Sequence, residues 1–208
     1  MSYIKITAKY LFLILLIIFC FRFLSNIGSL FENLEFNSFK QYLISSGVFL
    51  LLYLFLLRKH LEFWHSFFHE LTHVLFAMLC LCRIDGFSVS LTGGVTAYSG
   101  RKNWVISLSP YFFPIISLPL MAMSLVIRET ALLAVNHIVV LGYVFFLISL
   151  FRDFSFRQSD IRNSGKLFSV LIILILNILT LVFLLFYLQG DLTYLWEYTI
   201  RIMEVTGR

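Results

Sequence analysis

The sequence predicts an all-α polytopic membrane protein. The 208 residues are 60% hydrophobic and only 13% charged, and the mean hydropathy is +0.92. A soluble domain carries about 25% charged residues, so this chain lacks the polar residues that would coat a soluble core. The apolar residues also gather in runs close to the about 20 residues that a helix needs to cross hydrocarbon. Together these observations predict about six transmembrane helices.

Six apolar runs, separated by short polar segments, are the predicted helices. The first run follows Lys5 and Lys9, and bulky residues stand where a signal peptide needs small ones, which favours an uncleaved signal-anchor helix. The fourth run holds all three prolines of the chain. The runs comprise residues 10–24, 42–57, 61–82, 104–127, 131–151 and 167–188.

Two segments outside these runs have a predicted structure of their own. Between the third and fourth runs, β-forming residues alternate around Gly93 and Gly94, which predicts a short re-entrant β-hairpin. Residues 190–208 mix apolar and charged side chains and predict a short amphipathic helix at the membrane interface. The chain therefore divides into two N-terminal helices (1–59), a membrane core (60–189) and this tail (190–208).

The placement of charge and cysteine excludes two other classes of protein. The basic residues stand in short clusters between apolar runs, so the net charge of +5 favours membrane anchors over nucleic-acid binding. The positive-inside rule favours a cytoplasmic position for the hairpin and for residues 152–166. Cys20, Cys80 and Cys82 lie in or at the end of apolar runs, which argues against a disulfide framework.

The third run contains the sequence His69-Glu70-Leu71-Thr72-His73. Residues four apart lie on one face of a helix, so His69 and His73 present two imidazoles in the same direction. Two imidazoles and one carboxylate leave a fourth zinc position open to water, as in catalytic sites. Zinc lowers the pKa of that water to about 7, and Glu70 is near enough to transfer its proton to a leaving amine. A carboxylate near the bilayer centre costs about 3 kcal/mol, which favours a functional role for Glu70.

A third metal ligand must come from another part of the chain. Asp160 and Asp153 both lie between the fifth and sixth runs, and Asp160, which stands ahead of the last helix, is the preferred candidate. Asp153 stays the alternative, although the adjacent Arg152 offers it an ion-pair partner. Asp85 is assigned to the hairpin, and Glu129 is expected on the opposite side of the membrane.

Two further histidines each have a functional and a structural interpretation. His65 lies one turn before His69, where it either supports the metal site or, as we favour, is an interfacial histidine near the start of the span. His137 either lines a cavity or, as we favour, joins helices by hydrogen bonding beside Asn136.

The chain resembles the site-2-protease class of intramembrane zinc metallopeptidases, and most closely its small bacterial members. The resemblance covers roughly residues 61–188, which makes the core metallopeptidase-like. It is carried by His69-Glu70-Leu71-Thr72-His73, the Gly93-Gly94 hairpin, the stretch Ser107-Leu108-Ser109-Pro110-Tyr111, and Ser159-Asp160. In the family a glycine follows the aspartate, whereas here Ile161 follows Asp160.

The resemblance implies a function and a role for each of these residues. His69, His73 and Asp160 would bind Zn²⁺, Glu70 would be the acid–base group, and Gly93 and Gly94 would guide an extended substrate strand. The expected activity is cleavage of a membrane-spanning or membrane-associated protein in the lipid bilayer, and the expected location is the bacterial inner membrane.

Two other functions compete with this one. A catalytically idle relative would bind transmembrane segments as a regulator or chaperone, but it would have no use for the buried base Glu70. A metal transporter would use the five histidines as successive sites, but the polar residues are concentrated in one helix and two loops.

Overall fold

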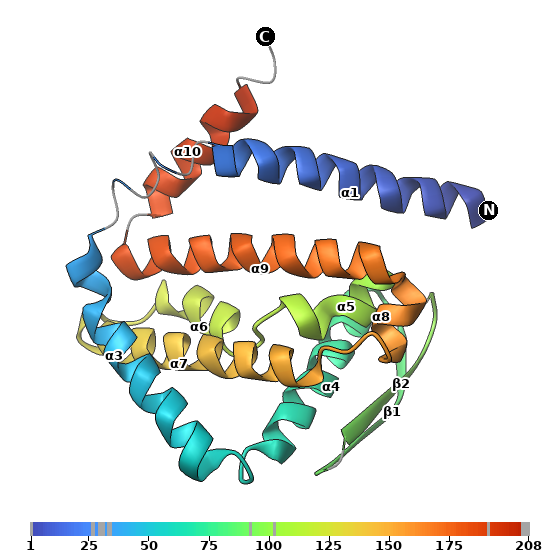
Figure 1. Ribbon diagram of the computed structural model, residues 1–208, viewed down its shortest axis with the longest axis horizontal. Helices are drawn as coiled ribbons and strands as arrows, with labels where there is room; N and C mark the ends of the chain where they lie inside the picture. Colours follow the sequence, from blue (N-terminus) through green and yellow to red (C-terminus); the bar gives the residue numbers. More distant parts are fainter. Residues whose placement is uncertain are drawn as a thin grey trace. The chain divides into compact units, whose positions relative to one another are not determined.

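The computed structural model describes residues 2–25, 28, 32, 35–91, 93–101, 103–190 and 192–204. The described chain is mostly helical and contains one two-stranded sheet (Figure 1), which confirms this part of the predicted fold class. It forms two compact units, one of Met1–Lys40 with Val170–Arg208 and one of Gln41–Ser169. The predicted division into N-terminal helices (1–59), membrane core (60–189) and tail (190–208) stays a prediction, because these two units are defined by compactness alone.

Three of the described helices are long and apolar enough to cross a membrane, which suggests a membrane protein. The six-span arrangement, with α1 (Ser2–Ser25) as its first helix, stays a prediction. The three candidates are Phe39–Leu57, which comprises most of α3 (Phe36–Leu52) and the π-helical turn η1 (Tyr53–Leu57), α7 (Glu129–Asp153) and α9 (Lys166–Gln189).

The helix that contains the two motif histidines, α4 (Glu62–Leu79), is not among the candidates found in the described residues. Its 18 residues would extend about 27 Å, enough to cross most of the hydrocarbon. Three histidines and two glutamates lower its mean hydropathy. That α4 spans the membrane therefore stays a prediction.

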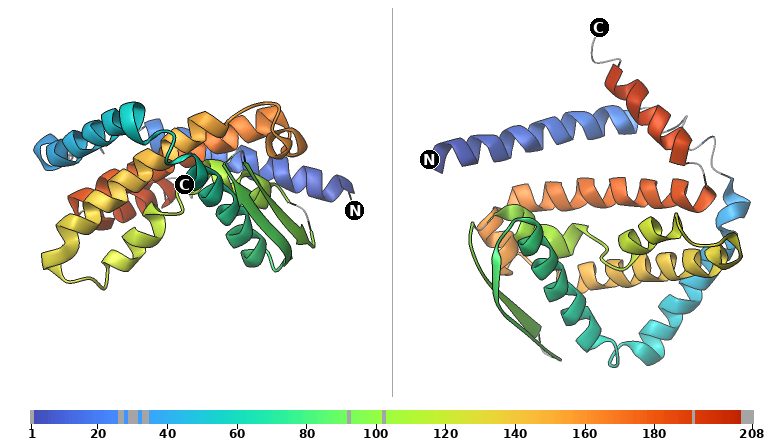
Figure 2. Two further views of the ribbon diagram at one scale, coloured as in Figure 1. Left: turned by 90° about the horizontal axis from the view of Figure 1, so that it is seen from below. Right: turned by 180° about the vertical axis from the view of Figure 1, so that it is seen from behind.

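The predicted hairpin is present, but its glycines lie outside the turn. Strand β1 (Arg83–Ser90) pairs antiparallel with β2 (Gly93–Ser99), and both strands lie against α4 (Figures 1 and 2). Ser90 pairs with Gly93, so Leu91 and Thr92 connect the strands, and Thr92 lies outside the described residues. The two glycines instead begin β2, where Gly93 has a φ of 146° that side chains rarely allow.

The helix predicted over residues 104–127 is broken in two. Helices α5 (Trp104–Phe112) and α6 (Ser117–Ser124) meet at an angle of 77°. Pro114 lies in the break, and the residue before it, Phe113, is extended because proline disfavours the helical conformation there. The break lets α5 pack against α4 while α6 packs against α7. If α5 and α6 together cross the membrane as one broken span, they are a fourth candidate span among the described residues.

The other compact unit contains the predicted tail helix. Helix α10 (Leu192–Glu204) packs against α1, and the hydroxyl of Tyr198 donates to the carbonyl of Phe23 at 2.8 Å. Phe23, Val182, Phe186 and Tyr198 form its buried cluster. Residues 205–208 lie outside the described part of the chain, and an interfacial position for α10 stays a prediction.

Candidate metal centre

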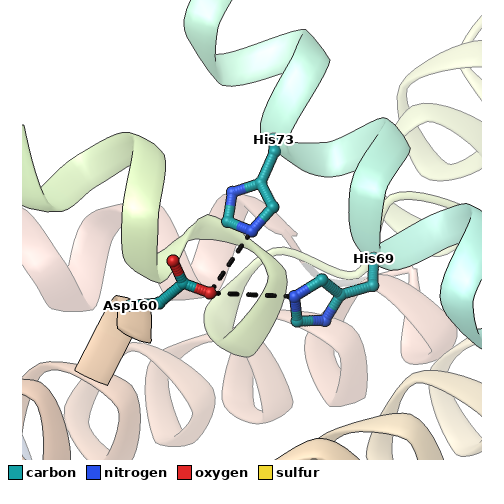
Figure 3. A group of neighbouring side chains, drawn as sticks. All are labelled: His69, His73 and Asp160. Carbon is teal, nitrogen blue, oxygen red and sulfur yellow. Dashed lines mark ion pairs between the residues drawn. The ribbon is translucent and has the colours of Figure 1, made fainter. Parts of the chain in front are cut away.

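His69, His73 and Asp160 converge on one point in the unit of residues 41–169 (Figure 3). The histidines come from one face of α4, and Asp160 comes from the first turn of α8 (Ser159–Ser164). The Oδ2 atom of Asp160 lies 3.5 Å from Nε2 of His73 and 4.0 Å from Nε2 of His69. One potential ligand atom from each residue lies within 4.8 Å of the other two. The structure therefore contains a possible three-residue metal site.

The chemistry of this group fits zinc. Zinc takes imidazole nitrogen and carboxylate oxygen at about 2.0–2.2 Å, so neighbouring ligands on a tetrahedral ion lie about 3.3 Å apart. The two distances to Asp160 exceed that value by less than an ångström. Calcium and magnesium prefer sites composed of oxygen atoms, which this group is not.

A short helix brings Asp160 to α4. Helix α7 ends at Asp153, and α8 begins at Ser159 after a five-residue connection. Helix α8 packs against α5, and its Ile161 is completely buried. Gly165, with a φ of 94°, ends α8 and separates it from α9. The aspartate that completes the group is thus positioned by the short connection after α7 and by the packing of α8 against α5.

Asp153, the alternative third ligand, lies on the other side of His69. Its Oδ2 atom is 3.5 Å from Nδ1 of His69, whereas Asp160 faces Nε2 of the same ring. Asp153 also forms an ion pair with Arg152 at 2.7 Å, as its sequence neighbourhood suggested. The structure therefore groups Asp160, and not Asp153, with the two histidines.

Both histidines have a partner at the nitrogen that faces away from Asp160. Nδ1 of His73 donates to the backbone carbonyl of Ile106 at 2.9 Å, since a carbonyl can only accept. Nδ1 of His69 faces the carboxylate of Asp153. A neutral imidazole with its proton on Nδ1 has its lone pair on Nε2, the atom that faces Asp160 in both rings.

Glu70 is buried, with 8% of the residue exposed, and β2 holds its carboxylate. The hydroxyl of Thr96 lies 2.7 Å from Oε2 of Glu70 and donates to it. A Cβ atom built on Gly94 would collide with Cγ of Glu70 and would lie 3.0 Å from the carbonyl oxygen of Ser88. A glycine at position 94 is therefore what lets the strand approach this side chain.

A cavity of about 1000 Å³ adjoins the candidate ligands. Its wall includes His69, Glu70, His73 and Asp160, and also Gly93 and Gly94 of β2. The volume lies at the upper end of the range for ligand pockets, about 300–1,000 Å³. The cavity is therefore large enough for a short peptide segment beside the candidate metal ligands.

Tyr98 adds a phenol to the same cavity. Partial burial raises the pKa of Tyr98, and the nearby acidic groups of Cys82 and Asp160 raise it further. Both effects disfavour the phenolate. Tyr98 is therefore a protonated hydrogen-bond donor at neutral pH.

His65 and His137 contact neighbouring helices and lie outside the wall of this cavity. The interfacial interpretation of His65 does not agree with the structure, in which the residue is 0% exposed and contacts Tyr53 and Ser149. The ring of His137 packs against Tyr42 with 4.9 Å between centroids, but its Nδ1 donates to the carbonyl of Leu133 in the same helix, and the hydrogen bond to Tyr42 comes from the neighbouring Asn136. Cys20, Cys80 and Cys82 are free thiols, so none forms a disulfide.

The sequence did not identify three of the contacts at this site. The partner of Glu70, Thr96, lies 26 residues away, and the partner of His73 is a backbone carbonyl 33 residues away. Neither contact leaves a pattern in the sequence. Asp153 was recognised as a candidate, but its contact with Nδ1 of His69 was not expected.

Comparison of the chain with protein-family models, curated proteins and solved structures finds no match.

Proposed function

We propose that this chain is a zinc-dependent endopeptidase of the site-2-protease type, which cleaves a membrane-spanning or membrane-associated protein. One observation carries the proposal: two imidazoles, a carboxylate and the buried Glu70 all line one cavity of about 1000 Å³. Metal-dependent hydrolysis of a peptide bond needs ligands for a Lewis-acid metal, a base and room for the substrate, and the cavity combines residues suited to each of these needs.

The reaction uses Glu70 as a proton carrier. The Glu70 carboxylate accepts a proton from water while the water oxygen bonds to the scissile carbonyl carbon. The carbon–nitrogen bond then breaks, and Glu70 returns the proton to the leaving amine. Thr96 keeps the carboxylate in place through its hydrogen bond to Oε2. When bound by His69, His73 and Asp160, zinc supplies Lewis-acid chemistry that makes water more acidic and polarises the carbonyl.

The substrate binds as an extended segment beside β2. In the described two-stranded sheet, β2 pairs with β1 along one edge only, and an edge without a strand partner can add a peptide strand. Gly93 and Gly94 lie in the cavity wall and have no side chains to keep a second backbone away.

The proposed location is a bacterial inner membrane, crossed several times. The three long apolar helices among the described residues support a membrane location. The six-span topology and the cytoplasmic position of the cavity follow from the apolar runs and the distribution of basic residues. The lipid bilayer and a protein substrate within it are then the partners, and nucleic acid is not.

Elemental analysis of zinc in the purified full chain is the first test. We expect about one zinc per wild-type chain and a strong loss of zinc in His69→Ala and in Asp160→Ala. His60→Ala is the matched control, because the exposed His60 lies in the turn before α4. Wild-type protein without zinc after metal loading would overturn the proposal.

Cleavage of labelled casein in detergent tests the catalytic step, because an unfolded protein offers extended segments to any endopeptidase. Glu70→Gln should retain zinc and lose cleavage, since the amide cannot accept the proton. An idle relative would show no cleavage in the wild type, and its binding of transmembrane segments would not change with Glu70→Gln.

A further inference from the structure

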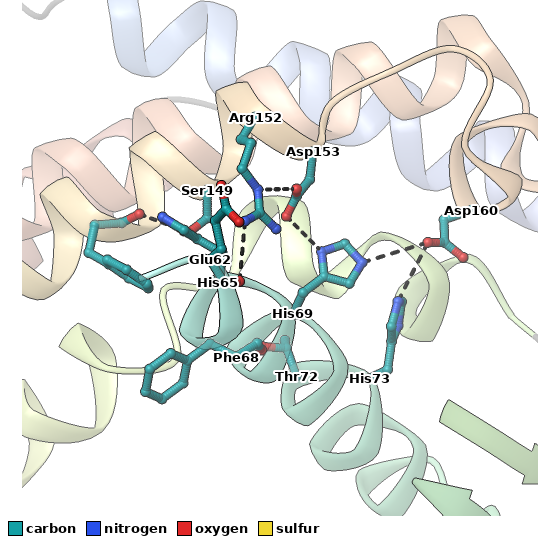
Figure 4. Close-up of polar contacts among 11 residues, drawn as sticks. Glu62, His65, Phe68, His69, Thr72, His73, Ser149, Arg152, Asp153 and Asp160 are labelled. Carbon is teal, nitrogen blue, oxygen red and sulfur yellow. Dashed lines mark hydrogen bonds and ion pairs between the residues drawn. The ribbon is translucent and has the colours of Figure 1, made fainter. Parts of the chain in front are cut away.

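The end of α7 meets the first half of α4 through two matching side-chain contacts (Figure 4). Nδ1 of His65 contacts Oγ of Ser149, and Nδ1 of His69 lies 3.5 Å from Oδ2 of Asp153. The two histidines are four residues apart, and so are Ser149 and Asp153. Four residues advance a helix by about 6 Å, so the two histidines and their two partners have the same spacing along their helices. Both contacts can therefore form at the same time.

The hydrogen-bond pattern places the proton of His65 on Nδ1. The Ser149 hydroxyl lies 2.9 Å from the carbonyl of Phe145 and gives its one hydrogen to that acceptor. In this arrangement Ser149 accepts from Nδ1 of His65. The Tyr53 hydroxyl, 3.1 Å away, donates to Nε2 of the same ring. Both ring nitrogens of His65 contact protein hydroxyls, and His65 is not part of the candidate metal group, despite its place on the same face as His69.

Asp153 determines which ring nitrogen of His69 carries the proton, and Arg152 holds Asp153 in position. An ionised carboxylate can only accept, and Asp153 lies closer to Nδ1 of His69 (3.5 Å) than Asp160 lies to Nε2 (4.0 Å), so the single proton of a neutral ring is placed on Nδ1. Arg152 donates from Nε to Oδ1 of Asp153 at 2.7 Å, and its second contact, at 3.4 Å, is with the carbonyl of Glu62 at the start of α4. Asp153 thus presents one oxygen to Arg152 and the other to His69.

We propose that α7 sets the tautomer of the α4 histidines, with Asp153 as the positioning residue for His69. Asp153 keeps the proton of His69 on Nδ1 and leaves the lone pair on Nε2, which points toward Asp160. Ser149 keeps His65 in the same tautomer and holds α4 in register with α7. The proposal rests on the proposed function only where it states that Nε2 of His69 binds zinc.

Asp153→Asn is the discriminating variant, because it keeps the size of the side chain and reverses its hydrogen bonding. Arg152 can only donate, so the amide oxygen turns to Arg152 and the NH₂ group faces His69. Two donors then meet unless His69 moves its proton to Nε2, which removes the lone pair that faces Asp160. A role in packing alone predicts that Asn is the mildest substitution, whereas a tautomer role predicts that Asn is at least as harmful as Leu.

The first measurement is ¹⁵N NMR of the histidine-labelled, metal-free full chain in detergent, with the His69 signals assigned by His69→Gln. We expect the Nδ1–H tautomer in the wild type, the Nε2–H tautomer in Asp153→Asn, and a mixture in Asp153→Leu. Asp153→Glu should restore the Nδ1–H form because it restores a carboxylate. Asp85→Asn is the control, since Asp85 also has an arginine partner, Arg83, but lies in the hairpin. An unchanged His69 tautomer in Asp153→Asn would overturn the proposal.

Zinc affinity, measured by chelator competition on the same proteins, separates this inference from the proposed function. We expect zinc affinity to fall about 10- to 100-fold in Asp153→Asn, and to a smaller extent in Asp153→Leu. If the tautomers respond as expected but the wild type binds no zinc, the tautomer assignment stands and the proposed function fails. If the wild type binds zinc and Asp153→Asn binds it equally well, the positioning role is overturned while the proposed function stands.

Discussion

Nδ1 of His73 donates a hydrogen bond of 2.9 Å to the backbone carbonyl of Ile106 in α5. In a regular helix this carbonyl would accept from the N–H four residues later, but that residue is Pro110, which has no N–H. The carbonyl instead accepts from His73 and from the Ser109 hydroxyl, the latter at 2.8 Å. A proline that weakens α5 thus frees the acceptor that orients a candidate metal ligand.

Replacement of Pro110 by alanine should therefore have opposite effects on stability and on metal binding. The new N–H bonds to Ile106, which raises the free energy of unfolding by up to about 3 kcal/mol. The same bond competes with His73 and lowers zinc affinity about tenfold. Thermal unfolding and chelator competition measure the two effects, with Pro119→Ala in α6 as the control. Equal zinc affinity in Pro110→Ala and the wild type would show that the freed carbonyl has no role in binding.

Thr96→Val removes the hydroxyl that holds Glu70 and keeps the shape of the side chain. We expect unchanged zinc content but at least about tenfold slower casein cleavage, because a displaced base transfers protons poorly. Thr180→Val in α9 is the matched control, since its hydroxyl bonds to the carbonyl of Leu176 in the same helix. Wild-type cleavage rates in Thr96→Val would contradict the positioning of Glu70 by β2.

Gly94→Ala tests the close approach of β2 to α4. The added methyl group meets Glu70 and the carbonyl of Ser88, so β2 or Glu70 must move. We expect a loss of about 1–3 kcal/mol in the free energy of unfolding, together with a loss of cleavage. Gly47→Ala has open space around the new methyl group and should be neutral or stabilising. Urea unfolding and cleavage assays on both variants measure these effects. Equal stability and equal cleavage in Gly94→Ala and Gly47→Ala would contradict the close approach of β2 to Glu70.

Membrane integration should survive alkaline carbonate extraction. Three described helices are apolar enough to cross a bilayer, and such helices stay in the lipid when charge-mediated contacts are removed. We expect the full chain in the carbonate-resistant pellet of expressing cells, whereas a peripheral protein used as control enters the supernatant. Release of the chain by carbonate would contradict a location within the bilayer.

Hydropathy and local spacing were good guides to single elements. The long apolar run of residues 167–188 forms α9, and the histidines four apart share a face of α4. They were poorer guides where prolines or polar groups interrupt a run. The run of residues 104–127 breaks at Pro114, and the two glycines of the hairpin begin β2 instead of forming its turn. In both cases the conformation of the backbone determined where the element breaks or turns, and hydropathy carries no information about that conformation.

The sequence by itself determined that the chain is mostly apolar and helical and that His69 and His73 point the same way, because both properties depend on neighbouring residues. Only the tertiary structure decided which aspartate joins them. Asp153 and Asp160 are seven residues apart, and the turn into α8 brings Asp160 to Nε2 while the end of α7 leaves Asp153 at Nδ1. The tertiary structure likewise decided the partners of Glu70, His73 and His65, which come from 26, 33 and 84 residues away along the chain. Such long-range contacts depend on where helices end and on the angles at which they cross. Those angles arise from the packing of the whole unit.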